Sequence, residues 1–117
     1  MSIIEKLGIS KSPWKAARDD CHFDSLSDIV DSDDKLICQS TGYSVDVMQK
    51  DCLLMASAPE MLEALIDEWF FIDKFLSVWA DSIDCAEYHK FNQRAEIIVC
   101  LVEKATGKSW EQIKELL

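Results

Sequence analysis

The fold is decided by residues 46–80, which read DVMQKDCLLMASAPEMLEALIDEWFFIDKFLSVWA. Apolar residues recur through this stretch at helical spacing, and Pro59 interrupts it once. Proline lacks a backbone N–H and clashes with the carbonyl four residues earlier, so one straight helix cannot continue through it. Ser57 and Glu60 have the spacing of a capping box, and proline is accepted in a first helical turn. The sequence therefore predicts a short helix that ends near Ala56 and a long helix that begins at Ser57.

A different periodicity precedes this stretch. Residues 29–30 and 36–38 are short β-branched runs on either side of a polar turn, which is the pattern of a hairpin. Residues 14–18 give a weaker strand. We therefore expect an α+β fold, with an antiparallel sheet of two or three strands within residues 14–40, followed by a helical C-terminal two-thirds.

The remaining chain continues the helical pattern. After a turn at residues 81–84, residues 85–105 predict an antiparallel partner for the long helix, with Gly107 as its left-handed cap. The inner face of this partner helix is predicted to comprise Phe91, Ala95, Ile98, Leu101, Val102 and Ala105. Ser109 starts a last amphipathic helix. At 117 residues the chain is expected to form a single domain, with a sheet-containing part (1–42) and a helical part (43–117).

The long helix is apolar around more of its circumference than a surface helix needs. Its inner face is predicted to comprise Leu62, Leu65, Ile66, Trp69, Ile72, Leu76 and Trp79. A second apolar set comprises Met61, Phe70, Phe71, Phe75 and Val78. One partner helix and a small sheet cannot cover both sets, so we expect a homo-oligomer, a homodimer or higher, with the second set at its interface.

Charge is concentrated in one segment. The net charge is −10, and residues 19–34 contain seven aspartates with no lysine or arginine. This balance disfavours direct binding to nucleic acid or to a membrane surface and favours a basic protein partner. The expected partner surface comprises Asp28, Asp31, Asp33 and Asp34, and a purely solubilising loop is the alternative.

Metal and cofactor sites have weak support in the sequence. Cys85 and His89 share a helix face, but the adjacent Cys21 and His22 have poor ligand spacing for zinc. The aspartates from residue 31 resemble the start of a calcium loop but lack its glycine and its final glutamate. We therefore expect no bound metal and no cofactor.

Catalytic motifs are likewise weak. The three glycines do not cluster into a phosphate-binding loop, and no nucleophile–base pair stands out. The prediction is that the protein is not an enzyme. Five widely spaced cysteines suit buried free thiols in a reducing cytoplasm, and no apolar run is long enough to span a bilayer.

Two stretches resemble one family. CLLMASAPEMLEAL (52–65) resembles the run ANARLIAAAPELLEAL of small proteins from tailed phages and prophages, and RAEIIVCLVEKATG (94–107) resembles the KATG ending of that family. The lead-in SPWK (12–15) also matches, although residues 51–53 replace the usual Asn-Ala-Arg. The resemblance implies an accessory protein of the infected or lysogenic host's cytoplasm, acting in host takeover or in blocking host defence.

Three functions remain open at this point. The first is a non-enzymatic oligomer that presents an acidic surface to a host protein. The second is an oligomer that binds or sequesters a nucleotide signal, for which Arg18, Lys90 and Arg94 are the candidate cations. The third is a small enzyme. Convergence of Arg18 and Arg94 in a cleft between subunits would favour the second function.

Overall fold

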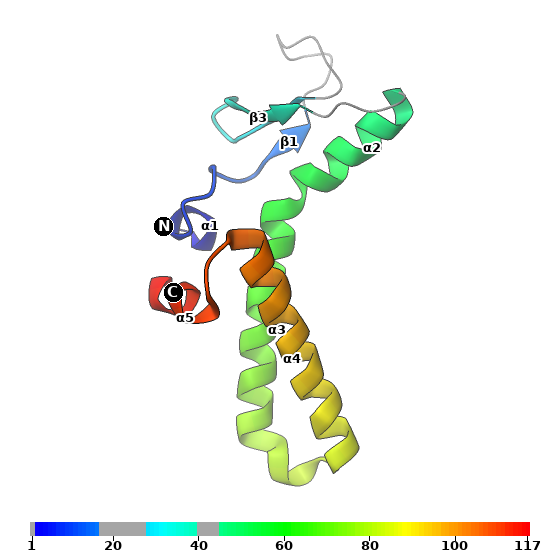
Figure 1. Cartoon of the computed structure of the whole chain (residues 1–117), viewed down its shortest axis with the longest axis vertical. Coiled ribbons are helices and arrows are strands. Elements are labelled where there is room, and N and C mark those ends of the chain that lie inside the picture. Colours follow the sequence, from blue (N-terminus) through cyan, green and yellow to red (C-terminus); the bar gives the residue numbers. More distant parts are fainter. Residues whose placement is uncertain (1, 17–27, 40–44) are drawn as a thin grey trace. The chain divides into compact units, whose positions relative to one another are not determined.

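The protein is described here from a computed structural model, which defines residues 2–16, 28–39 and 45–117 (Figure 1). The chain forms two compact units, residues 1–61 and residues 62–117, and each is described by itself. The expectation of a single domain stays a prediction.

The element order confirms the predicted α+β fold. A three-stranded antiparallel sheet is followed by a helical C-terminal region. The elements are α1 (Ile3–Lys6), β1 (Lys15–Ala16), β2 (Asp28–Val30), β3 (Leu36–Gln39), α2 (Val45–Ala56), α3 (Ala58–Trp79), the 3-10 turn η1 (Ala80–Ser82), α4 (Cys85–Thr106) and α5 (Trp110–Leu116).

The sheet of the first unit has the strand order β1-β2-β3. Val30 lies opposite Lys15 in β1, and Ile29 lies opposite Cys38 in β3. The register then shifts, so that Val30 pairs with Leu36. Such a bulge bends a short strand and increases its twist.

Helix α2 packs against β1 and β2. The core of this contact is formed by Ile29, Cys52 and Ala56, all buried, with Trp14 and Met55 packed around them. A sheet of three short strands needs an apolar cover to be stable in water, and α2 provides it.

The hairpin turn between β2 and β3 is organised by Asp31. Its side chain is 8% exposed, and its Oδ1 accepts the backbone N–H groups of Asp33 at 2.8 Å and Lys35 at 3.0 Å. Asp34 adopts a left-handed conformation with φ 62°, which aspartate tolerates better than most residues. The turn therefore depends on one carboxylate that satisfies two backbone donors.

The helix break lies where the sequence predicts it. Helix α2 ends at Ala56, and α3 begins at Ala58, one residue after the predicted start. Pro59 is buried in the first turn of α3, where a missing N–H costs little. The Ser57 hydroxyl donates to the Leu53 carbonyl at 3.0 Å, so it bonds back to the last turn of α2.

The second unit consists of α3 from Leu62 onward, α4 and α5. Helices α3 and α4 run antiparallel and side by side (Figure 1). The Asp84 carboxylate caps α4 by accepting the Glu87 N–H at 2.8 Å, and Gly107, with φ 69°, ends it in the predicted left-handed cap. Ser109 and Gln112 form the capping box that starts α5.

The core of the second unit differs in part from the predicted inner faces. The buried apolar side chains are Leu62, Ile66, Ile72, Ile98, Val102, Trp110 and Ile113. Trp79, Leu101 and Ala105 are exposed, so their assignment to inner faces was wrong. Trp79 is the last residue of α3, where the helix ends. On α4, only Ile98 and Val102 are buried, so the buried stripe of this helix is narrow and leaves Leu101 outside it.

The thiols also differ from expectation. Cys52 is buried, whereas Cys85 and Cys100 are exposed on α4. The sequence placed the cysteines in an apolar context, but helix rotation decides which of them face solvent.

Replacing Asp31 with Ala is expected to lower the free energy of unfolding by about 2 kcal/mol, because two backbone N–H groups lose a charged acceptor. Urea unfolding followed by circular dichroism measures this. Asp33→Ala removes the same chemical group from an exposed position and should change stability by less than about 0.5 kcal/mol. Equal losses in both variants would contradict the role of Asp31 in the turn.

Candidate interaction face on the second unit

One side of α3 carries a row of residues at alternating spacings of three and four. This α3 row comprises Ala64, Glu68, Phe71, Phe75 and Val78. Residues at these spacings lie along one helix face. Phe71 is 64% exposed and stacks on Phe75, with ring centroids 6.3 Å apart. The row therefore presents aromatic and aliphatic surface to solvent.

Helix α4 carries a second row with the same spacing. This α4 row comprises Glu87, Lys90, Arg94, Ile97, Leu101 and Lys104. Ile97 is 59% exposed, and Leu101 is also exposed. Cations near the N-terminal half of α4 are thus followed by apolar side chains in its C-terminal half.

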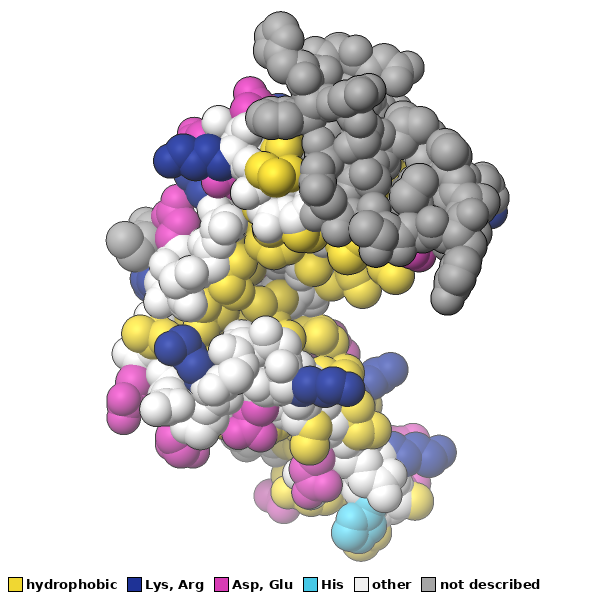
Figure 2. All heavy atoms as spheres, turned by 45° about the horizontal axis from the view of Figure 1, so that its top comes forward, with side chains coloured by type: hydrophobic (Ala, Val, Ile, Leu, Met, Phe, Trp, Pro, Cys, Tyr) yellow, Lys and Arg dark blue, Asp and Glu magenta, His cyan; other side chains and the backbone are white. Residues whose placement is uncertain are grey.

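The two rows meet along one side of the α3–α4 hairpin. Phe75 contacts Phe91 of α4, with ring centroids 5.1 Å apart, and Arg94 Nη1 lies 3.8 Å from Glu68 Oε1. We call this surface, formed by the α3 row and the α4 row, the two-helix face. Hydrophobic, acidic and basic side chains are interspersed on the surface shown in Figure 2.

Two hollows mark the two-helix face. One, of about 480 Å³, is lined by Leu65, Glu68, Lys90, Gln93, Arg94, Ile97, Ile98 and Leu101. The other, of about 520 Å³, is lined by Glu87, Lys90, Phe91 and Arg94. Lys90 and Arg94 line both, so the two hollows adjoin each other at these cations.

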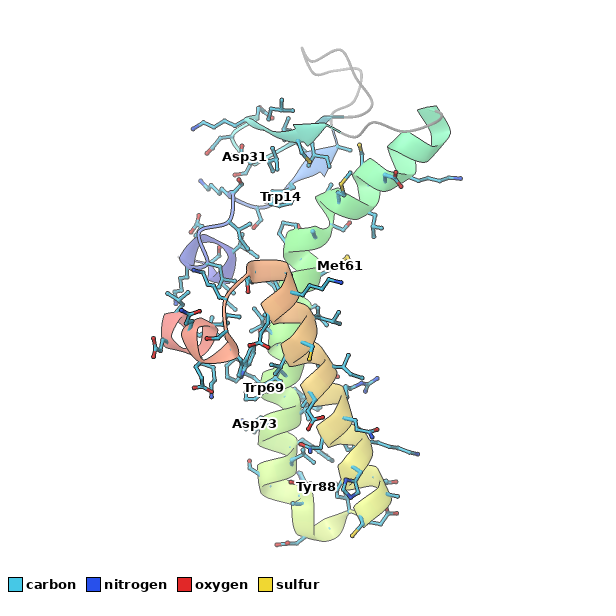
Figure 3. The ribbon with its side chains drawn as sticks, viewed as in Figure 1. Trp14, Asp31, Met61, Trp69, Asp73 and Tyr88 are labelled. Carbon is cyan, nitrogen blue, oxygen red and sulfur yellow. The ribbon has the colours of Figure 1, made fainter. Side chains whose placement is uncertain are left out.

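The opposite side of the hairpin is different in character. Its hollow, of about 440 Å³, has an apolar floor, and its lining comprises Trp69, Ile72, Asp73, Leu76, Asn92, Ala95, Glu96, Val99 and Cys100. Asp73, Asn92 and Glu96 are exposed there and are polar, with exposed Cys100 beside them. Figure 3 shows Trp69 and Asp73 on α3 and Tyr88 near the start of α4. Phe71, Val78, Ile97 and Leu101 are the exposed large apolar side chains of the two-helix face, and Phe70, Trp79 and Tyr88 are exposed elsewhere on the same unit.

The predicted oligomer residues divide into three groups. Phe71, Phe75 and Val78 belong to the two-helix face. Phe70 instead packs its ring edge-on against Trp69 at 5.1 Å and lies 6.4 Å from the ring of Trp110. Met61 is exposed and belongs to the first unit.

The predicted acidic partner surface is partly used within the first unit. The Asp31 carboxylate is buried in the hairpin turn, as described above. Asp33 and Asp34 are exposed, and Lys15 Nζ lies 2.7 Å from Asp34 Oδ1. The side chain of Asp28 lies outside the described residues.

The predicted ligand cations are also divided. Lys90 and Arg94 lie one turn apart on α4 and share both hollows. Arg18 lies outside the described residues, so its convergence with Arg94 stays a prediction.

Cys85 and His89 are exposed on the first two turns of α4, whereas Cys21 and His22 lie outside the described residues. Among the residues that the structure describes, no three Cys, His, Asp or Glu side chains are grouped so as to hold a metal ion. In the same part of the chain, no helix combines the length and the apolar character needed to cross a membrane.

The α4 row was missed by reasoning from sequence. Its signal, the alternation of three and four from Glu87 to Lys104, is present in the sequence, but Leu101 was assigned to the inner face. With Leu101 assigned inside, only Ile97 remained as an apolar member, and the row could not be recognised.

The fold and the two-helix face together define a small α+β protein with an exposed helical surface on its second unit. Comparison with families gives its origin. The model of the family described as Salmonella phage P22 protein Y8K6 matches residues 1–109, so the chain belongs to this phage protein family. Comparisons with curated proteins and with solved structures gave no significant match. The phage origin agrees with the resemblance described above, and the particular motif pattern quoted there stays a prediction.

Proposed function

We propose that this phage protein is a non-enzymatic accessory protein that acts by protein–protein contact in the cytoplasm of the bacterial host, in host takeover or in blocking host defence. It assembles as a homo-oligomer through α3. The observation that carries this proposal is the exposure of Phe71, Val78 and Ile97 on one side of the second unit.

Exposed apolar area supports the assembly. The largest apolar patch on a soluble monomer is typically roughly 300–600 Å² and is often an interaction site, and the two-helix face falls within that range. Burying apolar surface contributes about 25 cal/mol per Å², so covering several aromatic and aliphatic side chains supplies several kcal/mol before the cost of association. A homo-oligomer offers the simplest cover, because each copy carries the same surface.

The hairpin turn that carries Asp33 and Asp34, here called the acidic turn, supports a basic host partner. Asp33 and Asp34 are exposed, and the chain carries a net charge of −10. Such a surface attracts a basic protein and speeds its association at low ionic strength. Because Asp31 is engaged inside the turn, its carboxylate holds Asp33 and Asp34 in place rather than contacting the partner.

Oligomerisation is tested by light scattering on the purified protein at tens of micromolar. The expected mass is at least twice the 13.4 kDa of the chain. Joint replacement of Phe71 and Phe75 with Glu should give monomer or aggregate, because it places charges in the contact. A monomeric mass for the unmodified protein would contradict the proposed assembly.

Partner binding is tested by affinity capture from host lysate. Asp33→Asn together with Asp34→Asn should weaken capture of a host protein, most strongly at low salt, because screening already reduces the attraction at high salt. Glu115→Gln with Glu111→Gln is a control that removes two exposed charges from α5. Undiminished capture by the aspartate variant would assign the acidic turn a solubilising role.

Binding of a nucleotide signal is the second candidate function, favoured by the two cations that line both hollows of the two-helix face. Calorimetric titration with a cyclic dinucleotide and with a nucleoside triphosphate tests it. Binding that is lost in Lys90→Ala with Arg94→Ala, and kept in Lys104→Ala, would favour this function. Absence of heat with both probes would count against it.

A further inference from the structure

We infer that a second copy of this chain covers the whole two-helix face, α3 row and α4 row together, so that two hairpins form a four-helix bundle. This inference rests on the proposed self-association and deepens it, since it makes α4 half of the contact and leaves Phe70 out of it.

The spacing of residues in the two rows is the first argument for a second copy as the occupant. The α3 row and the α4 row each alternate between three and four residues. Helices pack knobs into holes along such a 3.5-residue repeat where its members are apolar, and six of the eleven members here are: Ala64, Phe71, Phe75, Val78, Ile97 and Leu101. Two adjacent antiparallel helices that present such rows on the same side make up half of a four-helix bundle. The missing half needs the same repeat, and α3 and α4 of another copy have it.

Charge selects a second copy over another macromolecule. The two-helix face carries Glu68 and Glu87 against Lys90, Arg94 and Lys104, which is nearly balanced, whereas the chain as a whole carries −10. Two copies repel each other over most of their surface and can approach only where the charge is balanced. A strongly basic or strongly acidic partner would instead require a face of one sign.

The exposed area has the right size for this occupant. Phe71, Val78, Ile97 and Leu101 expose between 47% and 64% of their surface, which amounts to roughly 400 Å². A standard interface buries about 800 Å² per partner, of which somewhat more than half is apolar. The face therefore supplies the apolar part of a stable dimer, and the charged members of the two rows, Glu68, Glu87, Lys90, Arg94 and Lys104, supply its polar part.

The test compares single substitutions at equally exposed positions. Ile97→Glu lies in the α4 row, and Leu54→Glu lies on α2, where Leu54 is 63% exposed. Sedimentation velocity over 1–100 µM gives the dimer dissociation constant for each protein. The inference expects a dimer for the unmodified protein, at least a 100-fold weaker dimer for Ile97→Glu, and a change below threefold for Leu54→Glu.

Retained folding is checked by circular dichroism, and Ile97→Gln serves as a milder second variant should Ile97→Glu lose helix. A dimer that persists unchanged in a folded Ile97 variant, yet dissociates on Phe71→Glu, would overturn the inference while leaving self-association through α3 intact. Equal weakening by Leu54→Glu would also overturn it. A monomer at 100 µM for the unmodified protein would overturn both the inference and the proposed assembly.

Discussion

Helix α3 carries more apolar side chains than the second unit buries, and the other features of this unit depend on that excess. Ile66 and Ile72 are fully enclosed, and the rings of Trp69 and Phe70 pack with Trp110 of α5. The side that bears Phe71 and Val78 has no such cover among the described elements of the unit. Burial of apolar surface is the largest favourable contribution to folding and association, so this side is the natural place for a partner.

Pro59 separates helix α2 from helix α3, and each of the two helices packs within a different unit. Because proline can neither donate a backbone hydrogen bond nor fit against the carbonyl four residues earlier, α2 must end before α3 begins. The break lets α2 cover the sheet with Cys52 and Ala56, while α3 forms the spine of the second unit.

Acidic side chains that accept hydrogen bonds from nearby backbone N–H groups stabilise the hairpin turn and the starts of two helices. The Asp31 carboxylate accepts a backbone N–H in the hairpin turn, and the Asp84 carboxylate accepts one at the start of α4. The Glu103 carboxylate accepts the Trp110 N–H at 2.9 Å at the start of α5. Each places an acidic group where backbone donors would otherwise lack a partner, and negative charge at a helix N-terminus also interacts favourably with its dipole. Part of the strong acidity of this chain is thus structural, and Asp31 is the aspartate of the hairpin turn whose carboxylate the fold itself uses.

The sequence by itself determined the elements and their order. Period-two runs, the proline break and the capping residues depend on interactions within a few residues, so the hairpin, the end of α2, the bounds of α4 and the start of α5 could be predicted closely. Tertiary structure alone decided which side of each helix is covered. Leu101 and Ile98 are equally apolar and three residues apart, yet only Ile98 is buried, because burial depends on which elements pack beside a helix. The two-helix face arises from that choice, since a sequence lists apolar residues but does not state which of them the fold leaves without a neighbour.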